Sequence, residues 1–316
     1  MRRAEIMPDS SGESRLPIQA VERETGVSKE LLRMWERRYS FPNPDRDEQG
    51  DRIYSQEQIN KLRLLRRLID NGFRPGKIVG LPIPELENLL RSRYSSTLAA
   101  APEIETELLA TLKSGDVHQV RDYLSHQLIR MGLQAFILEF LQFATPIVGD
   151  AWMRGLIEIH EEHSYTEQVQ NLIRNAIAGL RPTVSPPRVM ITTPPDEGHS
   201  LGVLMVEALL RLDSVDALSL GPMMPVREIV QSVQKNQADI VALSFSASFP
   251  SGKAVEFLEE IRFRLPMTID VWAGGSALRG SRRSVEGVEL FQDLESIRSA
   301  VQIWRRRHER RLERRQ

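Results

Sequence analysis

RVMITTPPDEGHSLG, residues 188–202, joins an apolar run to a stretch with helical spacing. A short β-branched run that ends in two prolines is typical of a buried strand followed by a loop. Further runs of the same kind follow along the chain, and they are VDALSL, DIVALSF and TIDVWAG, with helical patterns between them. This alternation predicts a doubly wound parallel sheet with helices on both faces over residues 187–305.

The loop after the first of these strands carries an unusual set of side chains. In a doubly wound sheet, ligands bind at the carboxyl ends of the strands, which is where DEGHSLG lies. We expect His199 to project from this edge, with Asp196 or Glu197 holding its second ring nitrogen, as in many metal sites. Gly198 is expected to let the loop turn, and Gly202 to allow a large ligand close to the helix. A lone histidine of this kind is more often a surface residue than a ligand.

Length and composition limit the class of protein. A chain of 316 residues predicts two or three domains, and 41% hydrophobic residues can fill their cores. The absence of cysteine excludes disulfides, thiolate zinc sites and thiol catalysis. No apolar run approaches the ~20 residues of a membrane span, and the polar N-terminus lacks a signal-peptide pattern. We therefore expect a cytoplasmic protein without a membrane partner.

Charge is distributed unevenly along the chain. The net charge is −1, yet the last stretch, RRRHERRLERRQ, holds seven arginines and two glutamates. Basic ends around an acidic middle fit either a nucleic-acid module attached to other domains or solvated helix faces. We leave two interpretations open for the basic tail: a helix that packs its apolar side, or a second phosphate contact.

Two proline-containing linkers, SSTLAAAPE at 95–103 and RPTVSPP at 181–187, divide the chain. Between them, four segments with helical spacing predict a four-helix bundle. We therefore predict a multidomain α and α/β protein. Its parts are a disordered tail at 1–15, a DNA-binding domain at 16–92, a helical bundle at 103–181, a flavodoxin-like α/β domain at 187–305 and a basic tail at 306–316.

The N-terminal segment has the pattern of a winged helix–turn–helix. Gly26 separates two helical stretches, and Ser28 is placed to cap the second, SKELLRMWERRY. FPNPDRDEQGDRIYS then contains a Gly50 turn, which suggests a wing. The following helix repeats apolar residues at Ile59, Leu62, Leu65 and Leu68, one face at helical spacing.

The second helix of such a motif enters the major groove while basic residues hold phosphates. LRMWERRY, followed by P-x-P-x-R and G-D-R-x-Y, resembles the MerR-type winged helix–turn–helix across residues 16–83. The resemblance implies DNA contacts from Arg33 and from the wing arginines. The alternative is solvated arginines around core aromatics such as Trp35. The predicted DNA-binding residues are Lys29, Arg33, Arg37, Arg38, Tyr39, Arg46, Arg52 and Tyr54.

Glu197-x-His199-x-x-Gly202 is similar to the E/D-x-H-x-x-G motif of cobalamin-binding domains. That family also has S-x-S/T/L and G-G after later strands, and this chain has VALSFSAS and VWAGGSA there. The resemblance implies that His199 is the lower axial ligand of cobalt. The residues that it implies for the cofactor on this domain are Glu197, His199, Gly202, Ser244, Ser246, Gly274 and Gly275.

The bundle carries a further motif, Trp152 followed after nine residues by Glu162 and His163. It resembles the W-x9-E-H motif of the CarH/LitR-type photoreceptor repressors, with Met153 and Ser164 as departures from the pattern of many members. The resemblance implies that Trp152 and Glu162 pack around the adenosyl group of adenosylcobalamin and that His163 also binds the cofactor, with methylcobalamin as an alternative cofactor. It also implies a light- or ligand-sensing repressor of operator DNA that forms a dimer or tetramer with its cofactor.

Two other functions remain open. A MerR-type regulator without cobalamin, controlled by a protein partner, would keep the DNA-binding domain alone. A corrinoid methyl-carrier protein would share the bundle and sheet but lack that domain. No G-x-S-x-G elbow or acid–base pair stands out, so we expect no enzyme activity.

Overall fold

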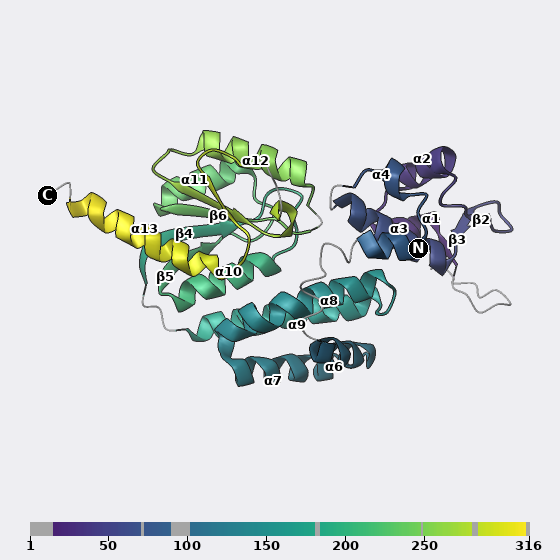
Figure 1. Ribbon diagram of the computed structural model, residues 1–316, viewed down its shortest axis with the longest axis horizontal. Coiled ribbons are helices and arrows are strands. Elements are labelled where there is room, and N and C mark those ends of the chain that lie inside the picture. The colour runs from purple at the N-terminus through teal and green to yellow at the C-terminus, as the bar shows by residue number, and fades with distance from the viewer. Residues whose placement is uncertain are drawn as a thin grey trace. The chain divides into compact units, whose positions relative to one another are not determined.

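The computed structural model describes residues 15–70, 73–89, 102–180, 184–247, 249–279 and 284–313. The predicted N-terminal tail before Arg15 and most of the linker at 95–103 lie outside these residues. The chain divides into two compact units, Met1–Lys113 with Thr145–Glu162, and Ser114–Ala144 with His163–Gln316. Each unit is described by itself below (Figure 1).

The first unit contains a small head of helices around a three-stranded antiparallel sheet, in the order β1-β3-β2. Gly26, with φ 66°, ends the first helix, and the Ser28 hydroxyl accepts a hydrogen bond from Leu31 N at 3.3 Å. The expected helix–turn–helix is therefore present, and β2 and β3 pair as an antiparallel hairpin in the segment where a wing was predicted. The elements are β1 Leu16–Pro17, α1 Ile18–Thr25, α2 Lys29–Tyr39, β2 Asp45–Arg46, β3 Arg52–Tyr54, α3 Gln56–Asp70 and α4 Pro75–Ile78.

The core of the head follows the predicted apolar face of α3. Its residues Ile59, Leu62, Leu65 and Leu68 are all fully buried, together with Trp35 of α2. Residues at this spacing lie on one side of a helix, so this side of α3 packs in the same core as the buried residues of α1 and α2. This arrangement fixes α2 with its other face turned outward.

Four helices lie in the predicted bundle segment, with one π-helical turn between two of them. They are α6 Pro102–Lys113, α7 Val117–Ala135, η1 Phe136–Leu141, α8 Gln142–Met153 and α9 Ile159–Gly179. Gly132, with φ 76°, interrupts α7, and the rings of Phe136 and Phe140 stack in η1 at 5.4 Å between centroids. A π turn of this kind often marks a functional position. Association of the four helices into one bundle stays a prediction.

The continuous stretch Val117–Trp152 is long and apolar enough to cross a membrane by length and composition alone. A core helix of a soluble protein meets the same criterion, and 39% of its most apolar window is buried. The sequence pattern divides this stretch between two of the four predicted helical segments, VRDYLSHQLIRMG and FILEFLQFATPIVGDAW.

The second unit contains a five-stranded parallel sheet in the order β5-β4-β6-β7-β8. This is the flavodoxin-like strand order, as predicted. Its elements are β4 Ser185–Thr192, α10 Leu201–Leu212, β5 Val215–Ser219, α11 Val226–Asn236, β6 Ile240–Ser244, α12 Ser251–Arg264, β7 Asp270–Gly274, η2 Ser276–Leu278, β8 Val288–Phe291 and α13 Ser296–Glu313.

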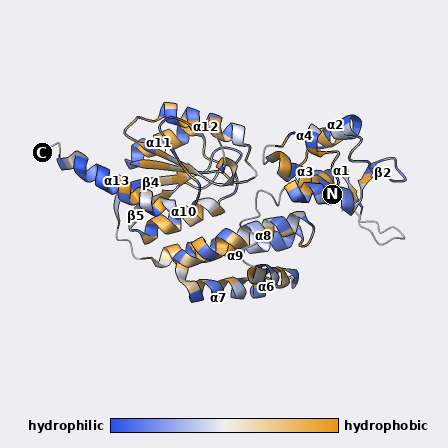
Figure 2. Cartoon of the chain, in the orientation of Figure 1, coloured by the Kyte–Doolittle hydropathy of each residue, from blue (hydrophilic) through white to orange (hydrophobic). Residues whose placement is uncertain are grey.

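Helices cover both faces of this sheet (Figure 1). α11 and α12 bury Val233, Leu258 and their neighbours against one face, and α10 and α13 bury Val203 and Val301 against the other. The strands between them are hydrophobic (Figure 2). Both faces of the sheet are therefore covered by helices. The place where a domain of this kind binds ligands is the set of loops at the carboxyl ends of the strands.

Three boundaries differ from the prediction. β4 begins at Ser185, so two prolines assigned to the linker lie inside the strand, where the register shifts between Ser185 and Arg188. Prolines are tolerated in a central strand at such an irregularity because no ladder donor is needed there. The edge strand β8 was not predicted. α13 runs through the boundary expected at 305/306, so the described part of the basic tail, residues 306–313, is the end of a helix.

Candidate cofactor and DNA-binding sites

The loop between β4 and α10 is shaped by Asp196. This residue has φ 67°, in the left-handed region, whereas Gly198 does not have a positive φ. A Cβ atom on Gly198 would meet no atom within 4 Å. The turn expected from Gly198 is therefore made two residues earlier, by an aspartate, a type that tolerates this conformation.

Glu197 connects the histidine to the neighbouring strand end. Its Oε1 accepts hydrogen bonds from the backbone N of His199 at 3.0 Å and lies 2.6 Å from His199 Nδ1. Its Oε2 accepts from the backbone N of Ser246 at 2.8 Å. The Ser246 hydroxyl lies 3.1 Å from the same Nδ1. Of the two carboxylates that the sequence left open, Glu197 is the one that holds the ring.

Burial and hydrogen bonding act in opposite directions on Glu197. Its side chain is 2% exposed, while that of His199 is 64% exposed. Burial raises the pKa of Glu197, but the hydrogen bonds from His199 and Ser246 outweigh it and hold the pKa below the ordinary value. Because Nδ1 of the exposed imidazole contacts the buried carboxylate, Nε2 is the ring nitrogen that could bind a metal.

Thr193, which the sequence analysis did not select, supports this loop from below. It is fully buried, and its hydroxyl donates to the Glu197 carbonyl and accepts from Met223 N at 2.8 Å. It thereby joins the end of β4 to the segment after β5. A polar residue at the inner end of an apolar strand was the signal that could have identified it.

The predicted small residues allow close packing of the strand ends. A Cβ atom on Gly202 would lie 2.5 Å from Ser244 Oγ. A Cβ atom on Gly275, which has φ 111°, would lie 2.1 Å from the Phe245 carbonyl oxygen, and one on Gly274 would lie 3.4 Å from the Phe291 carbonyl. In this structure these glycines therefore bring α10 and the ends of β6, β7 and β8 together.

A cleft of about 740 Å³ lies beside α10, and Ser200, the residue after His199, is part of its wall. This volume is in the range of small-molecule sites. Arg174 and Ile177 of α9, Leu204 of α10, and Gly221 after β5 also line it. The cleft therefore lies next to the histidine loop, between α10 and α9.

Trp152 and Glu162 belong to the first unit. Trp152, in α8, is half-buried and packs against the core of the head, with the Arg63 guanidinium carbon 5.7 Å from its ring centroid. Its Nε1 is buried and finds no hydrogen-bond partner in the described part of the chain. Glu162, half-buried, and His163, exposed, lie in the first turn of α9. Their contact with a cofactor stays a prediction.

The exposed face of α2 forms a basic stripe. Lys29, Arg33 and Arg37 follow one another at i, i+4 spacing and are exposed, as is Arg38. Like charges at this spacing destabilise an isolated helix, so the stripe is better explained by an anionic partner than by helix stability. Phosphates supply that partner when the helix lies in a DNA groove.

The other four predicted DNA-binding residues have different surroundings. Tyr54 is fully buried, so it packs in the head's core instead of offering its hydroxyl to DNA. Tyr39 is half-buried against the core, and the guanidinium carbon of Arg38 lies 5.4 Å from the centroid of its ring. Arg52 Nε donates to Glu36 at 2.9 Å, which orients it, and Arg46 of the hairpin is exposed.

Comparisons with known proteins agree with this architecture. Residues 16–81 match the MerR HTH family of regulatory proteins. The HTH-type transcriptional repressor CarH of Myxococcus xanthus is 30% identical over 276 residues, covering 84% of this chain and 91% of CarH. The repressor CarA of the same organism is 25% identical over 291 residues, covering 92% of this chain and 96% of CarA.

Among solved structures, a monomethylamine corrinoid protein of Methanosarcina barkeri covers 65% of this chain and 100% of its own. Its TM-score is 0.49 at 15% identity, a likeness too low to support a conclusion about a ligand. The identity to CarH is twice as high, and it extends over most of both chains. The chain therefore belongs to the family of HTH-type transcriptional repressors that includes CarH, with a DNA-binding head of the MerR type.

Proposed function

We propose that this protein is a transcriptional repressor whose binding to operator DNA is controlled by adenosylcobalamin on the α/β domain. The observation that carries the proposal is the exposed His199 imidazole, with Nδ1 held 2.6 Å from the buried Glu197 carboxylate. A single oriented imidazole supplies one coordination bond. It suits a metal that arrives with its equatorial ligands already in place, as cobalt does in a corrin ring.

The residues around His199 fit such a group. The histidine loop, Ser246, and Gly274 and Gly275 at the end of β7 meet at the carboxyl edge of the sheet, where doubly wound domains bind ligands. Bound adenosylcobalamin would supply a cobalt–carbon bond that light breaks. The chain would supply the lower ligand, His199, and the Glu197 carboxylate that contacts its Nδ1 would fix the orientation of the ring.

The helical segment completes the proposal as a four-helix cap. Trp152, Glu162 and His163 contact the adenosyl group in this scheme and lose that contact when the group is removed. A cofactor that binds one conformation better shifts the population toward it. The conformation with the adenosyl group assembles dimers or tetramers, and several heads on one assembly raise operator affinity by multivalency. The protein then acts in the cytoplasm on a repeated or palindromic operator.

The first experiment is an absorption spectrum with a size-exclusion profile of the full chain and adenosylcobalamin, in the dark and after green light. We expect a bound chromophore and an assembly that dissociates on illumination. Binding without a change of size would leave a ligand sensor that light does not switch. No binding would favour the regulator controlled by a protein partner.

Replacing Arg33 with alanine should weaken operator binding by about 1–3 kcal/mol, the cost of losing one base contact. Arg33 is exposed in the middle of the α2 stripe, so the fold should not change. Fluorescence anisotropy with operator DNA measures the effect. Arg23→Ala, an exposed arginine at the end of α1, serves as the control. Equal losses in the two variants would remove Arg33 from the DNA contact.

Replacing Trp152 with alanine should reduce the preference for adenosylcobalamin over methylcobalamin by about 1–3 kcal/mol, the value of stacking a base on an aromatic ring. Trp152→Phe should retain most of the preference. Titration of both cofactors in the dark, followed by absorbance, gives the ratio. If the alanine variant discriminates as well as the parent, Trp152 acts only in packing against the head.

A further inference from the structure

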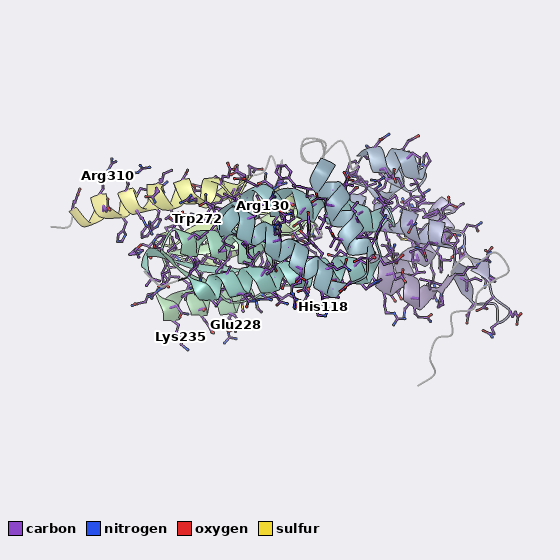
Figure 3. All side chains as sticks on the ribbon, turned by 90° about the horizontal axis from the view of Figure 1, so that it is seen from below. His118, Arg130, Glu228, Lys235, Trp272 and Arg310 are labelled. Atoms are coloured by element: carbon purple, nitrogen blue, oxygen red, sulfur yellow. The ribbon has the colours of Figure 1, made fainter. Side chains whose placement is uncertain are left out.

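α13 continues well beyond the apolar side chains that the structure describes as buried. Ile297, Ala300, Val301 and Trp304 are buried against the sheet at helical spacing, and Trp304 is the last of them. The helix nevertheless runs on to Glu313. Its outer end is hydrophilic (Figure 2) and stands clear of the other elements of the α/β domain (Figures 1 and 3). Packing therefore explains the first half of α13 but not the second.

The arginines of the first half are used within the domain. Arg298 pairs with Asp213 at 2.6 Å and also contacts Gln134. Arg305 donates to the Pro186 carbonyl at 2.8 Å and to Ser185 Oγ at 2.8 Å. These contacts hold α13 to the domain, so the direction in which its outer end points is fixed by the fold.

Three arginines of the second half have no such contacts among the residues that the structure describes. Arg306, Arg307 and Arg310 are exposed, and within the described part of the chain no ion pair or hydrogen bond involves their side chains. At 3.6 residues per turn they lie within about 100° of one another on one side of the helix, and Glu309 and Glu313 lie on the face opposite Trp304, beside Arg306. Arg310 extends from the outer end of α13 (Figure 3). We name these three arginines the α13 basic face.

We propose that the α13 basic face binds the phosphate backbone of duplex DNA, as a sequence-independent contact in addition to the head. Guanidinium groups bind phosphate oxygens with paired donors. Three of them spread along one side of a helix suit a partner with several phosphates in a row better than one small anion. The head of the same chain brings duplex DNA to a high local concentration, which favours DNA over other anionic partners. The inference rests on DNA binding by the head and does not depend on cobalamin.

The test compares full-length protein with the triple variant R306Q/R307Q/R310Q on a random-sequence duplex, over a series of salt concentrations. Each phosphate contact that is lost lowers the slope of log affinity against log salt by about 0.9, so the slope should fall by about 2–3. The Lys variant R306K/R307K/R310K should retain the parental slope. Size-exclusion profiles confirm that the assembly is the same in each case.

The matched control is K235Q/K253Q/R264Q, which removes the same charge from exposed positions elsewhere on the α/β domain. It should change the slope by less than half as much. An unchanged slope in the α13 variant, or an equal change in the control, would overturn the proposal. Loss of binding to phosphatidylserine vesicles with an unchanged DNA slope would also overturn it, in favour of a membrane surface. Failure of the cobalamin proposal would leave this result unaffected.

Discussion

Replacing His199 with alanine should abolish the spectral signature of a histidine-ligated cobalamin and weaken cofactor binding by more than about 100-fold. Removing only an outer-shell partner of a metal ligand costs about 10–100-fold, and here the ligand itself is lost. The side chain is 64% exposed and supports no core, so the protein should stay folded. Absorbance titration with adenosylcobalamin in the dark gives the affinity. Random-duplex binding by the head should be unchanged without cofactor.

Two further variants make the result specific. Glu197→Gln keeps the size of the side chain that lies 2.6 Å from Nδ1 but removes its charge, so an intermediate loss of about 10–100-fold is expected. His118→Ala removes an exposed histidine of α7 and should have no effect. If His199→Ala binds cobalamin as tightly as the parent, the lower-ligand assignment is wrong. The repressor controlled by a protein partner then becomes the better explanation.

The position of His199 at the sheet edge could be predicted from the sequence, but its hydrogen-bond partners could not. His199 at the end of the first strand follows from strand order, because carboxyl ends of parallel strands meet at one edge. The choice of Glu197 over Asp196 depends on the backbone of this loop, in which Asp196 is left-handed and the next residue, Glu197, is buried. The support from Thr193 depends on a contact with Met223, far along the chain. Local patterns carry no information on such contacts.

The same limit applies to the fold. Four of the five strands were predicted because each is a continuous apolar run with helical patterns on either side. β8 was missed because Val288–Phe291 is short and only half-buried at the edge of the sheet. The prolines in β4 were assigned to a linker because the register shift that accommodates them depends on pairing with β5. Both strand assignments depend on pairing with a neighbouring strand, which local residue propensities do not reveal.

Replacing Gly275 with alanine should destabilise the α/β domain severely, by at least about 3–5 kcal/mol. The new Cβ would lie 2.1 Å from the Phe245 carbonyl oxygen, a backbone atom that also accepts a hydrogen bond from Ala277 N at 3.3 Å. Gly275 has φ 111°, which adds strain for any residue with a side chain. A loss of this size is a large share of the ~5–15 kcal/mol that stabilises a domain. Thermal unfolding and limited proteolysis of the cofactor-free protein measure it.

The control for this variant is Gly252→Ala in α12, where a Cβ would meet nothing within 4 Å. It should be neutral or slightly stabilising, because alanine is the better helix former. If Gly275→Ala unfolds as the parent does, the close approach of the β6 and β7 ends is not required for stability. If it fails as expected, Gly275 is needed for the fold before any cofactor binds. The glycine pair then identifies the fold alone, and the case for cobalamin depends on the oriented imidazole of His199.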